Sequence, residues 1–447
     1  MELPGKAKDL EGIRRVCRPA PLIGKELESF FVETDMARDP HQETRKRLIE
    51  ALNSREDARL LFYGHRGCGK STELNKLLAE QKERFLPVTF SVHDQMSPTA
   101  ICAEDLILII AERVLNAAKN YNLKVDDDLL KPVLDYFNDT TRTTTESRDS
   151  QLKAGAGVSS KAGLLGPLLG VFARLSAQIK LEAHSKETTV ALLRKRPSDL
   201  LVQANNVIEA VRKPLLEKNL PLLIVVEDLD KLELMQAREM YVNHVNLLTG
   251  ITANIIYTIP IFLFHSPDVN AFKHHFDDVV ALPMIKVTDP EGQPAPGFDT
   301  VKKIIMQRIE DNLIKEDALD RLVTMTGGVL RHAFDVLHTA AVMVDARVPL
   351  EQEHINYGLN QLRKDFWQQI TLPFHPLPDG PKSVDDLYNR LADYGRKQLK
   401  GEKPRPVSDS VNQLLLKSCA LVEYNGEGWF GVHPLVIENL KDLGRLS

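Results

Sequence analysis

A short apolar run that leads into a glycine-rich loop constrains the fold of this chain more than any other stretch. Residues 60–63 read Leu-Leu-Phe-Tyr, which is typical of a buried β-strand. Residues 64–71 read Gly-His-Arg-Gly-Cys-Gly-Lys-Ser and match the pattern G-x-x-x-x-G-K-[ST] at every fixed position. Leucines at helical spacing follow in residues 72–78, so we expect a helix to begin near Lys70. The sequence therefore predicts a strand, a glycine-rich loop and a helix in direct succession.

The residue types in this loop suit the phosphate chain of a nucleotide. Glycines allow backbone N–H groups to turn inward around the phosphates, and the N-terminus of the following helix adds a partial positive charge. Lys70 is placed to reach the β- and γ-phosphates, and the Ser71 hydroxyl is placed to complete the Mg²⁺ shell. We therefore predict a nucleotide site formed by Gly64, His65, Arg66, Gly67, Cys68, Gly69, Lys70, Ser71 and Thr72.

Length and composition indicate a globular protein of several domains. The chain has 447 residues, enough for about two or three domains, and 27% of its residues are charged. Its net charge of −5 argues against general binding of polyanions, although a local basic patch is compatible with it. The four cysteines lack metal-ligand spacing, and no stretch reaches the ~20 apolar residues that span a bilayer. Without a signal-peptide pattern at the charged N-terminus, we expect a cytoplasmic protein.

A second predicted strand ends in a cluster of carboxylates. Residues 222–226 form an unbroken apolar run, which is typical of a parallel strand buried on both faces. Glu227, Asp228 and Asp230 follow it directly, and α/β sheets bind ligands at the carboxyl ends of their strands. We therefore predict that the acids of this cluster hold the Mg²⁺ shell and polarise the attacking water.

Three stretches outside these strands allow different interpretations. Residues 30–32 read Phe-Phe-Val and form either part of a pocket for the base or ordinary core. Residues 1–23 look irregular, and the polar residues 138–150 predict an exposed loop. Residues 154–179 mix glycines with leucines, which is unfavourable for a continuous helix. They form either an insertion that contacts a partner, a neighbouring subunit or a membrane surface, or a hairpin folded back on the core.

The middle of the chain contains three candidate sensors of the γ-phosphate. A strand is predicted over residues 254–264, with Thr258 inside it and Ser266 just beyond its end. The proline-rich residues 289–297 indicate a domain boundary, after which the pattern becomes helical. Arg331 follows paired glycines at the start of a helix. It either lies across the nucleotide or is an ordinary surface residue.

The C-terminal part predicts two amphipathic helices and then a β-hairpin. Apolar runs flank Asn425 and Gly426, a dipeptide that favours a tight hairpin turn. Helices followed by a terminal hairpin suggest a winged-helix module. A basic strip between the helices either contacts the phosphates of duplex DNA or is a solvated loop, and it contains Arg396, Lys397, Lys400, Lys403 and Arg405.

Taken in order, these elements resemble those of a known family. The loop at 64–71, the acidic strand end at 227–230 and the stretch 327–331 resemble the Walker A, Walker B and sensor-2 elements of AAA+ ATPases. The chain is similar to the initiator-type (origin-recognition-like) and STAND-like P-loop ATPases, which carry a helical lid and a C-terminal winged helix. The resemblance implies an α/β fold with a parallel sheet, ATP and Mg²⁺ as cofactors, Arg331 at the nucleotide, and ATP-driven rearrangement of core and lid.

The resemblance also implies a division into domains. Residues 1–59 lead into the core, and residues 60–297 form the P-loop ATPase core with an insertion at 138–185. Residues 298–375 form the helical lid that carries the sensor-2-like arginine. Residues 376–447 form the winged-helix-like domain.

The sequence departs from the family pattern in two places. In the Walker B element of the family, Asp usually comes directly before Glu, whereas here Glu227 precedes Asp228. By register, Glu227 joins Ser71 in the metal shell, and Asp228 activates the water while Lys70 holds the phosphates. Asp is shorter than Glu by one methylene, so we expect slow hydrolysis. No arginine lies between residues 266 and 279, where a ring-type finger would be expected, and both departures favour a switch over a motor.

These features support two main hypotheses on function. In the first, ATP closes the lid through Arg331 and exposes a surface for self-association or for a separate effector protein. Many bacterial STAND-like ATPases act in signalling or in defence against phage, and the resemblance makes that setting plausible. In the second, the protein is a DNA loader or remodeller that uses the winged helix. A small-molecule kinase is disfavoured, because it would need an acceptor pocket and a compact lid.

Overall fold

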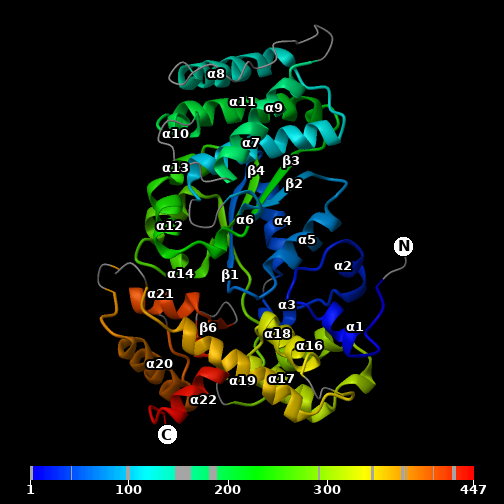
Figure 1. Cartoon of the computed structure of the whole chain (residues 1–447), viewed down its shortest axis with the longest axis vertical. Helices are drawn as coiled ribbons and strands as arrows, with labels where there is room; N and C mark the ends of the chain where they lie inside the picture. The colour runs from blue at the N-terminus through cyan, green and yellow to red at the C-terminus, as the bar shows by residue number, and fades with distance from the viewer. Residues whose placement is uncertain are drawn as a thin grey trace.

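The computed structural model describes residues 4–41, 43–96, 101–145, 163–180, 189–289, 292–343, 347–373, 377, 380–405, 407–424 and 429–446. A parallel sheet lies at the centre of the molecule (Figure 1). A stack of helices covers one end of the sheet. Two further helical groups, one of which contains the C-terminus, lie beyond the other end.

The central sheet has five strands in the order β2-β3-β4-β1-β5, and every neighbouring pair is parallel. This confirms the predicted α/β fold with a parallel sheet. The carboxyl ends of parallel strands meet at one edge, so the loop after β1 and the acids at the end of β3 lie at the same edge. The strands are β1 (Arg59–Gly64), β2 (Leu86–Ser91), β3 (Leu222–Glu227), β4 (Asn254–Pro260) and β5 (Asp278–Ala281).

Helices cover both faces of the sheet, as the uninterrupted apolar strands require. Alternate residues of β1 enter two separate hydrophobic clusters, with Leu60 in one and Leu61 in the other. Helices α4 (Thr44–Ser54) and α5 (Lys70–Glu80) pack in the cluster of Leu60. The cluster of Leu61 contains the apolar side chains of α7 (Ala103–Asn120).

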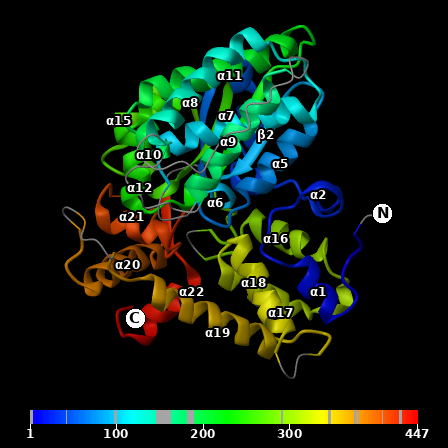
Figure 2. The same cartoon turned by 45° about the horizontal axis from the view of Figure 1, so that its top comes forward.

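The stack of helices (Figures 1 and 2) is formed by the residues that lie between β2 and β3 in the sequence. It consists of α7, which follows the short α6 (Val92–Gln95), and of α8 (Asp127–Thr145), α9 (Leu165–Lys180), α10 (Thr189–Leu193) and α11 (Pro197–Leu216). The prediction of an exposed loop at 138–150 was wrong as far as Thr145, because α8 continues to that residue. The remaining residues of that stretch lie outside the described part of the chain.

Helix α9 resolves part of the ambiguity at 154–179. Residues 154–162 lie outside the described residues, but the rest forms a helix that packs on α7 and α8. Its buried positions recur at helical spacing: Leu168, Phe172, Leu175 and Ile179. Gly166 and Gly170 face open space, so packing of the opposite face outweighs their weak helix propensity. This stretch therefore folds back on the core, although as a helix rather than a hairpin.

The N-terminal region is ordered and tied to distant elements, so the prediction of an irregular segment was wrong for part of it. Helix α1 (Leu10–Val16) packs on α18, with Ile13 fully buried. Helix α2 (Gly24–Phe30) packs on α5, and α3 (Asp35–Arg38) packs on α16. This region therefore joins the core to the following helical group.

Residues after the sheet form a helical group at the place where the sequence predicts the lid, and this group is called the lid below. It contains α16 (Pro296–Met306), α17 (Glu316–Thr326), α18 (Leu330–Ala341) and α19 (Gln352–Gln369). Gly327 ends α17 in a left-handed conformation (φ 60°), which a glycine adopts without strain. The turn brings the N-terminus of α18 back toward the loop after β1.

The C-terminal group contains α20 (Val384–Leu399), α21 (Ser410–Lys417), the antiparallel pair β6 (Leu421–Tyr424) and β7 (Trp429–Val432), and α22 (Pro434–Asp442). The two predicted strands are confirmed, whereas the Asn425-Gly426 turn lies outside the described residues. Both strands are buried throughout. Tyr424 also forms a bridge with Met284, which follows β5, so the hairpin packs against the core.

The predicted strand over 254–264 was wrong at its end, because β4 ends at Pro260 and α14 (Ile261–Phe264) follows it. Before β4 lie α12 (Leu234–Arg238), a π-helix and α13 (Val245–Thr249). After β4, α15 (Val269–Phe272) precedes β5, which stops at Ala281. Among the described residues, no helix is long and apolar enough to cross a membrane.

Candidate nucleotide-binding site

The loop between β1 and α5 has the backbone geometry that its glycines allow. Gly67 and Gly69 both have left-handed φ angles, of 83° and 107°. A Cβ atom at Gly67 would lie 2.6 Å from the Cβ of Arg331, so only glycine permits this approach of the lid. The loop therefore joins a strand to a helix N-terminus, as predicted.

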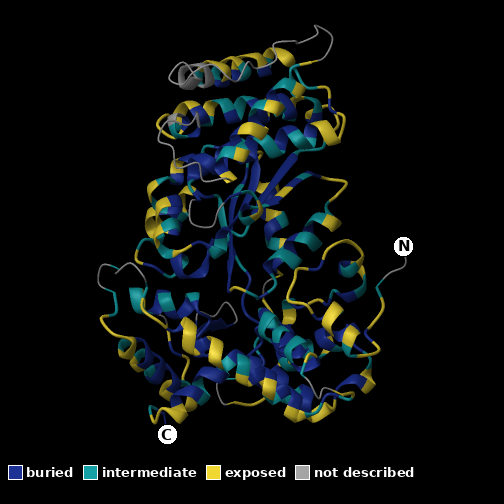
Figure 3. Cartoon of the chain, in the orientation of Figure 1, coloured by how far each residue is buried: buried dark blue, intermediate teal, exposed yellow. Residues whose placement is uncertain are grey.

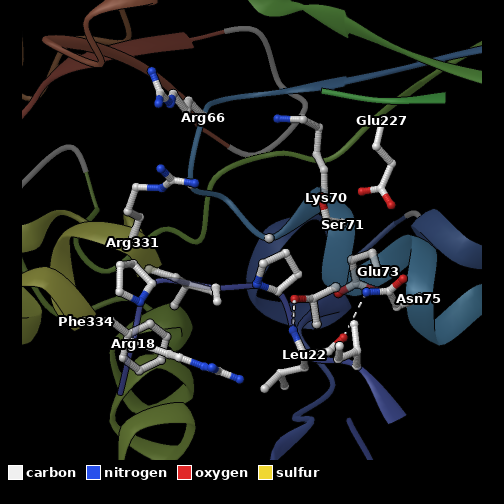
Figure 4. Close-up of a pocket in the computed structure, with 18 of the residues that line it drawn as sticks. Arg18, Leu22, Arg66, Lys70, Ser71, Glu73, Asn75, Glu227, Arg331 and Phe334 are labelled. Atoms are coloured by element: carbon white, nitrogen blue, oxygen red, sulfur yellow. Dashed lines mark hydrogen bonds between the residues drawn. The ribbon is translucent and has the colours of Figure 1, made fainter. Parts of the chain in front are cut away.

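A cavity of about 550 Å³ lies beside this loop, a size suited to a nucleotide. Side chains from the loop, the acidic strand end, the lid and the N-terminal segment surround it (Figure 4). Predicted site residues on its wall are Arg66, Gly67, Gly69, Lys70, Ser71, Thr72, Glu227, Asp228 and Arg331. The structure thus brings together residues from four separate parts of the chain.

Lys70 is buried and held by three oxygen atoms. Its Nζ donates to the carbonyl oxygens of Gly64 and His65, at 2.8 and 2.9 Å, and pairs with Asp230 at 2.9 Å. Burial alone would lower the pKa of Lys70, but the Asp230 carboxylate raises it above its usual value. The sequence placed Asp230 in the acidic cluster of the predicted magnesium site but did not link it to Lys70, because only the fold shows which lysine it faces.

Glu227 and Ser71 meet as the metal-shell prediction requires. The Ser71 hydroxyl hydrogen-bonds the Glu227 carboxylate, whose pKa burial raises to about 7. A hydroxyl and a carboxylate beside a phosphate loop fit Mg²⁺, which prefers oxygen ligands and few protein groups. These two residues would hold the ion, which would neutralise phosphate charge when bound.

Asp228 lies at the cavity but already has two partners. Its backbone is left-handed (φ 69°), its Oδ2 accepts from Ser91 Oγ at 2.6 Å, and its Oδ1 pairs with Lys231 at 2.6 Å. Burial alone would raise the pKa of Asp228, but the hydrogen bonds from Lys231 and Ser91 hold it below its usual value. The group is therefore an ionised carboxylate, as a water-activating role requires.

Several predicted residues turn their side chains away from the cavity. His65 and Cys68 are buried behind the loop, so only their backbone can serve a phosphate. Thr258 donates to the Val226 carbonyl and accepts from the Leu229 N–H, and Ser266 accepts from the Asp268 N–H. Neither Thr258 nor Ser266 lines the cavity, so they are not the γ-phosphate sensors that the sequence suggested.

The N-terminal segment forms the end of the cavity away from the acids. Residues 30–32, for which the sequence left a base pocket and ordinary core packing open, line it and also pack in hydrophobic clusters. Residues 18–23 line it as well and were missed. Leu22 is fixed there, because its N–H donates to Thr72 Oγ1 at 3.2 Å and its carbonyl accepts from Asn75 at 2.9 Å (Figure 4). The prolines at 19 and 21 were a local signal for an extended segment.

The lid reaches the loop through Arg331. Its backbone N–H donates to the Gly67 carbonyl at 3.3 Å, and its side chain lies at the cavity (Figure 4). The Nε of this side chain is buried without a hydrogen-bond partner among the described residues. An unpaired guanidinium nitrogen at the phosphate end suits an anionic ligand.

The hairpin of the C-terminal group contacts the back of the same loop. The Glu423 N–H donates to His65 Nε2 at 2.7 Å, and the Glu423 carboxylate lies 3.0 Å from His265 Nε2. Burial, with the charges of Lys70 and His265, lowers the pKa of His65 to about 3, so its ring is a neutral acceptor. The Tyr424 hydroxyl donates to the Gly327 carbonyl at 3.3 Å. Sequence reasoning missed this interface entirely.

The parallel sheet, the phosphate loop and the lid arginine together form a P-loop fold of the α/β class, in agreement with the fold predicted from the sequence. No protein-family model and no curated protein matches the chain. Solved structures that resemble it include three with TM-scores below 0.5.

The first of these structures is Cdc6p from Pyrobaculum aerophilum, with 13% identity, a TM-score of 0.36 and coverage of 95% of this chain and 100% of that one. The Orc1 protein of Aeropyrum pernix, solved in complex with DNA, has 14% identity, a TM-score of 0.40 and 96% coverage of both chains. A RuvB variant from Thermotoga maritima has 11% identity, a TM-score of 0.32 and coverage of 90% and 93%.

Proposed function

We propose that this protein is a slowly hydrolysing ATPase that acts as a conformational switch. One observation carries the proposal: the lid and the C-terminal hairpin both hold the phosphate loop. Arg331 of the lid contacts Gly67 on one side, and Glu423 of the hairpin contacts His65 on the other. A change in the loop therefore acts on both elements at once.

Nucleotide binding follows from the groups at the cavity. The loop N–H groups and the N-terminus of α5 would receive the phosphates, and Lys70 would exchange its contact with Asp230 for the β- and γ-oxygens. Arg331 would meet the outer phosphate with its unpaired guanidinium nitrogen. Mg²⁺ would be held by Ser71 and Glu227, where it offsets the phosphate charge.

Slow hydrolysis follows from the state of Asp228. The residue is the ionised carboxylate next to the metal-shell acid, but Ser91 and Lys231 hold both of its oxygens. To orient water, it must release one of these contacts, and its side chain is shorter than that of Glu. Because phosphoryl transfer depends on positioning, both features slow the reaction.

The switch would act by releasing the hairpin. Phosphates that draw the loop toward the cavity move the ring of His65 away from the Glu423 N–H, which weakens the contact between the core and the hairpin. The surfaces exposed in this way would then bind a second copy of the chain or a separate effector protein. A role in bacterial defence against phage stays a prediction from the sequence resemblance.

The mass of the particle tests this proposal. The mass is measured by light scattering in ADP and in a non-hydrolysable ATP analogue with Mg²⁺, each with and without duplex DNA. We expect a larger assembly with the analogue alone. Lys70→Ala should abolish the shift, because it removes a charge at the β- and γ-phosphates. A mass that never responds to the analogue, in a protein that binds it, would contradict a switch based on self-association.

DNA binding is a second candidate, favoured by the basic strip that begins in the last turn of α20 and continues beyond it. Arg396, Lys400 and Arg405 are exposed there. However, α21 packs against α14 of the core and Lys417 pairs with Glu233, so the helix before the hairpin is covered. Salt-dependent binding of duplex DNA that disappears when Lys400 and Lys403 are reversed to Glu would support this function.

A further inference from the structure

Arg308 is a buried cation at the nucleoside end of the cavity. It follows α16 in the lid, is only 6% exposed and lines the cavity beside Ile304. Its guanidinium lies 4.6 Å from the ring centroid of Phe334 and 5.7 Å from that of Phe30. One ring belongs to the lid and the other to the N-terminal segment, so together they fix the plane of the group.

Few groups within the protein use the donors of Arg308. Nη1 donates to the Ile304 carbonyl at 2.6 Å, and no carboxylate of the described chain pairs with the side chain. Burial lowers the pKa of Arg308 to about 10, so its surroundings disfavour the charge. A guanidinium has five N–H donors, and those of Arg308 that the protein does not use face the cavity, where a ligand can supply acceptors.

The position of Arg308 indicates which part of a ligand it meets. Arg331 and Phe334 lie about one turn apart on α18. Arg331 contacts the phosphate loop, whereas Phe334 contacts Arg308. A nucleotide whose phosphates lie at Ser71 therefore extends its nucleoside half toward Arg308 and residues 30–32.

We propose that Arg308 is a specificity-determining residue that donates hydrogen bonds to acceptor atoms on the base edge or ribose of the bound nucleotide. The inference rests on the proposed nucleotide binding and goes beyond it by assigning the recognition of the nucleoside. Because two phenyl rings pack against the guanidinium, the ligand meets its N–H edge rather than its flat face. The lid then holds the nucleotide at both ends, through Arg331 and Arg308.

Paired titrations with ATP and with inorganic tripolyphosphate, both with Mg²⁺, test this role. Arg308→Met keeps an unbranched apolar side chain between the rings but removes the donors. This variant should lower the affinity for ATP about tenfold or more, because hydrogen bonds to charged groups are strong. It should leave the affinity for tripolyphosphate unchanged. Lys303→Gln, which removes an exposed cation from the preceding helix α16, is the matched control and should change neither affinity.

The comparison of two ligands within one variant separates recognition from folding, because both ligands need the same folded protein. Equal losses for ATP and tripolyphosphate, or an unchanged ATP affinity, would overturn the role of Arg308. A wild-type protein that binds neither ligand would overturn the nucleotide site itself. If the proposal holds, 7-deaza-ATP and 2′-deoxy-ATP identify the acceptor atom. The analogue that lacks this atom should bind the wild-type protein with the same reduced affinity that ATP has for Arg308→Met.

Discussion

At the scale of single residues, the acids after β3 are not equivalent. Each of the three carboxylates already holds a different partner: Ser71 for Glu227, Ser91 with Lys231 for Asp228, and Lys70 for Asp230. Phosphates and Mg²⁺ must therefore exchange with these partners instead of entering vacant positions. This exchange makes opposite predictions for the two members of the Lys70–Asp230 pair.

Asp230→Asn should strengthen ATP binding, whereas Lys70→Ala should weaken it. The Asn side chain keeps an oxygen acceptor but removes the charge that competes with the phosphates, so affinity should rise several-fold, or about 1 kcal/mol. Without nucleotide, the same variant should lose about 1–3 kcal/mol of unfolding free energy, because Lys70 loses its buried anion. Calorimetric titration and denaturant unfolding measure the two effects. Weaker ATP binding by Asp230→Asn would show that Asp230 helps the ligand rather than competing with it.

Asp228 and Glu227 should separate hydrolysis from metal binding. Asp228→Asn keeps the shape of the side chain but removes the base, so it should retain ATP·Mg²⁺ affinity and slow hydrolysis about 10²-fold or more. Glu227→Gln should instead weaken the dependence of ATP binding on Mg²⁺. Single-turnover phosphate release and ATP titrations with and without Mg²⁺ distinguish the variants. Normal hydrolysis by Asp228→Asn would assign the catalytic role to a different carboxylate.

At the scale of elements, the sequence predicted what short stretches determine locally. The motif at 64–71 predicted a strand before it and a helix after it, and the apolar run at 222–226, which ends in β-branched residues, favoured a buried strand. By contrast, α9 contains glycines that argue against a helix, and only its packing on α7 and α8 stabilises it. The role of residues 18–23 was missed for a related reason, since the contacts of Leu22 lie about 50 residues away on α5.

A buried histidine pair joins the lid helix α18 to α22. His332 Nδ1 lies 3.1 Å from His433 Nε2, and His433 Nδ1 accepts the Leu435 N–H at the start of α22. Burial and the charge of Arg331 lower the pKa of His332 to about 3, and burial also holds the pKa of His433 below its usual value. Both rings are therefore neutral in the folded protein.

This pair predicts loss of stability in acid. An unfolded histidine takes up a proton near pH 6.5, whereas the folded pair resists protonation. The stability contributed by the neutral pair is thus present above pH 6.5 and declines as pH falls from 6.5 toward 3. For each unit by which the pH falls within that range, each histidine should lower the unfolding free energy by about 1.4 kcal/mol. Denaturant unfolding from pH 7.5 to 5 should show a shallower slope for His332→Gln, with exposed His274→Gln as control. Equal slopes would contradict the assignment.

At the scale of the whole molecule, the N-terminal segment, the lid and the C-terminal hairpin all meet around the phosphate loop. The N-terminal segment contacts α5 and the lid, the lid contacts the loop, and the hairpin contacts both the loop and the lid. Ligand-induced movement of one of these elements must break contacts with the others. The hairpin holds the loop through the hydrogen bond from the Glu423 N–H to the His65 ring, so we expect it to separate when the loop moves.

Hydrogen exchange of β6 tests whether the hairpin separates when ATP binds. The Glu423 N–H is bonded to His65, so the amides of β6 should be protected without nucleotide and exchange faster in the presence of a non-hydrolysable ATP analogue with Mg²⁺. Arg331→Ala should bind the analogue more weakly and, at saturating analogue, show little of this change, because the lid no longer responds to the outer phosphate. Arg347→Ala, which alters an exposed arginine of the lid, should behave like wild type. Unchanged exchange of β6 in a wild-type protein saturated with the analogue would place the moving element elsewhere and leave the hairpin as a fixed part of the nucleotide site.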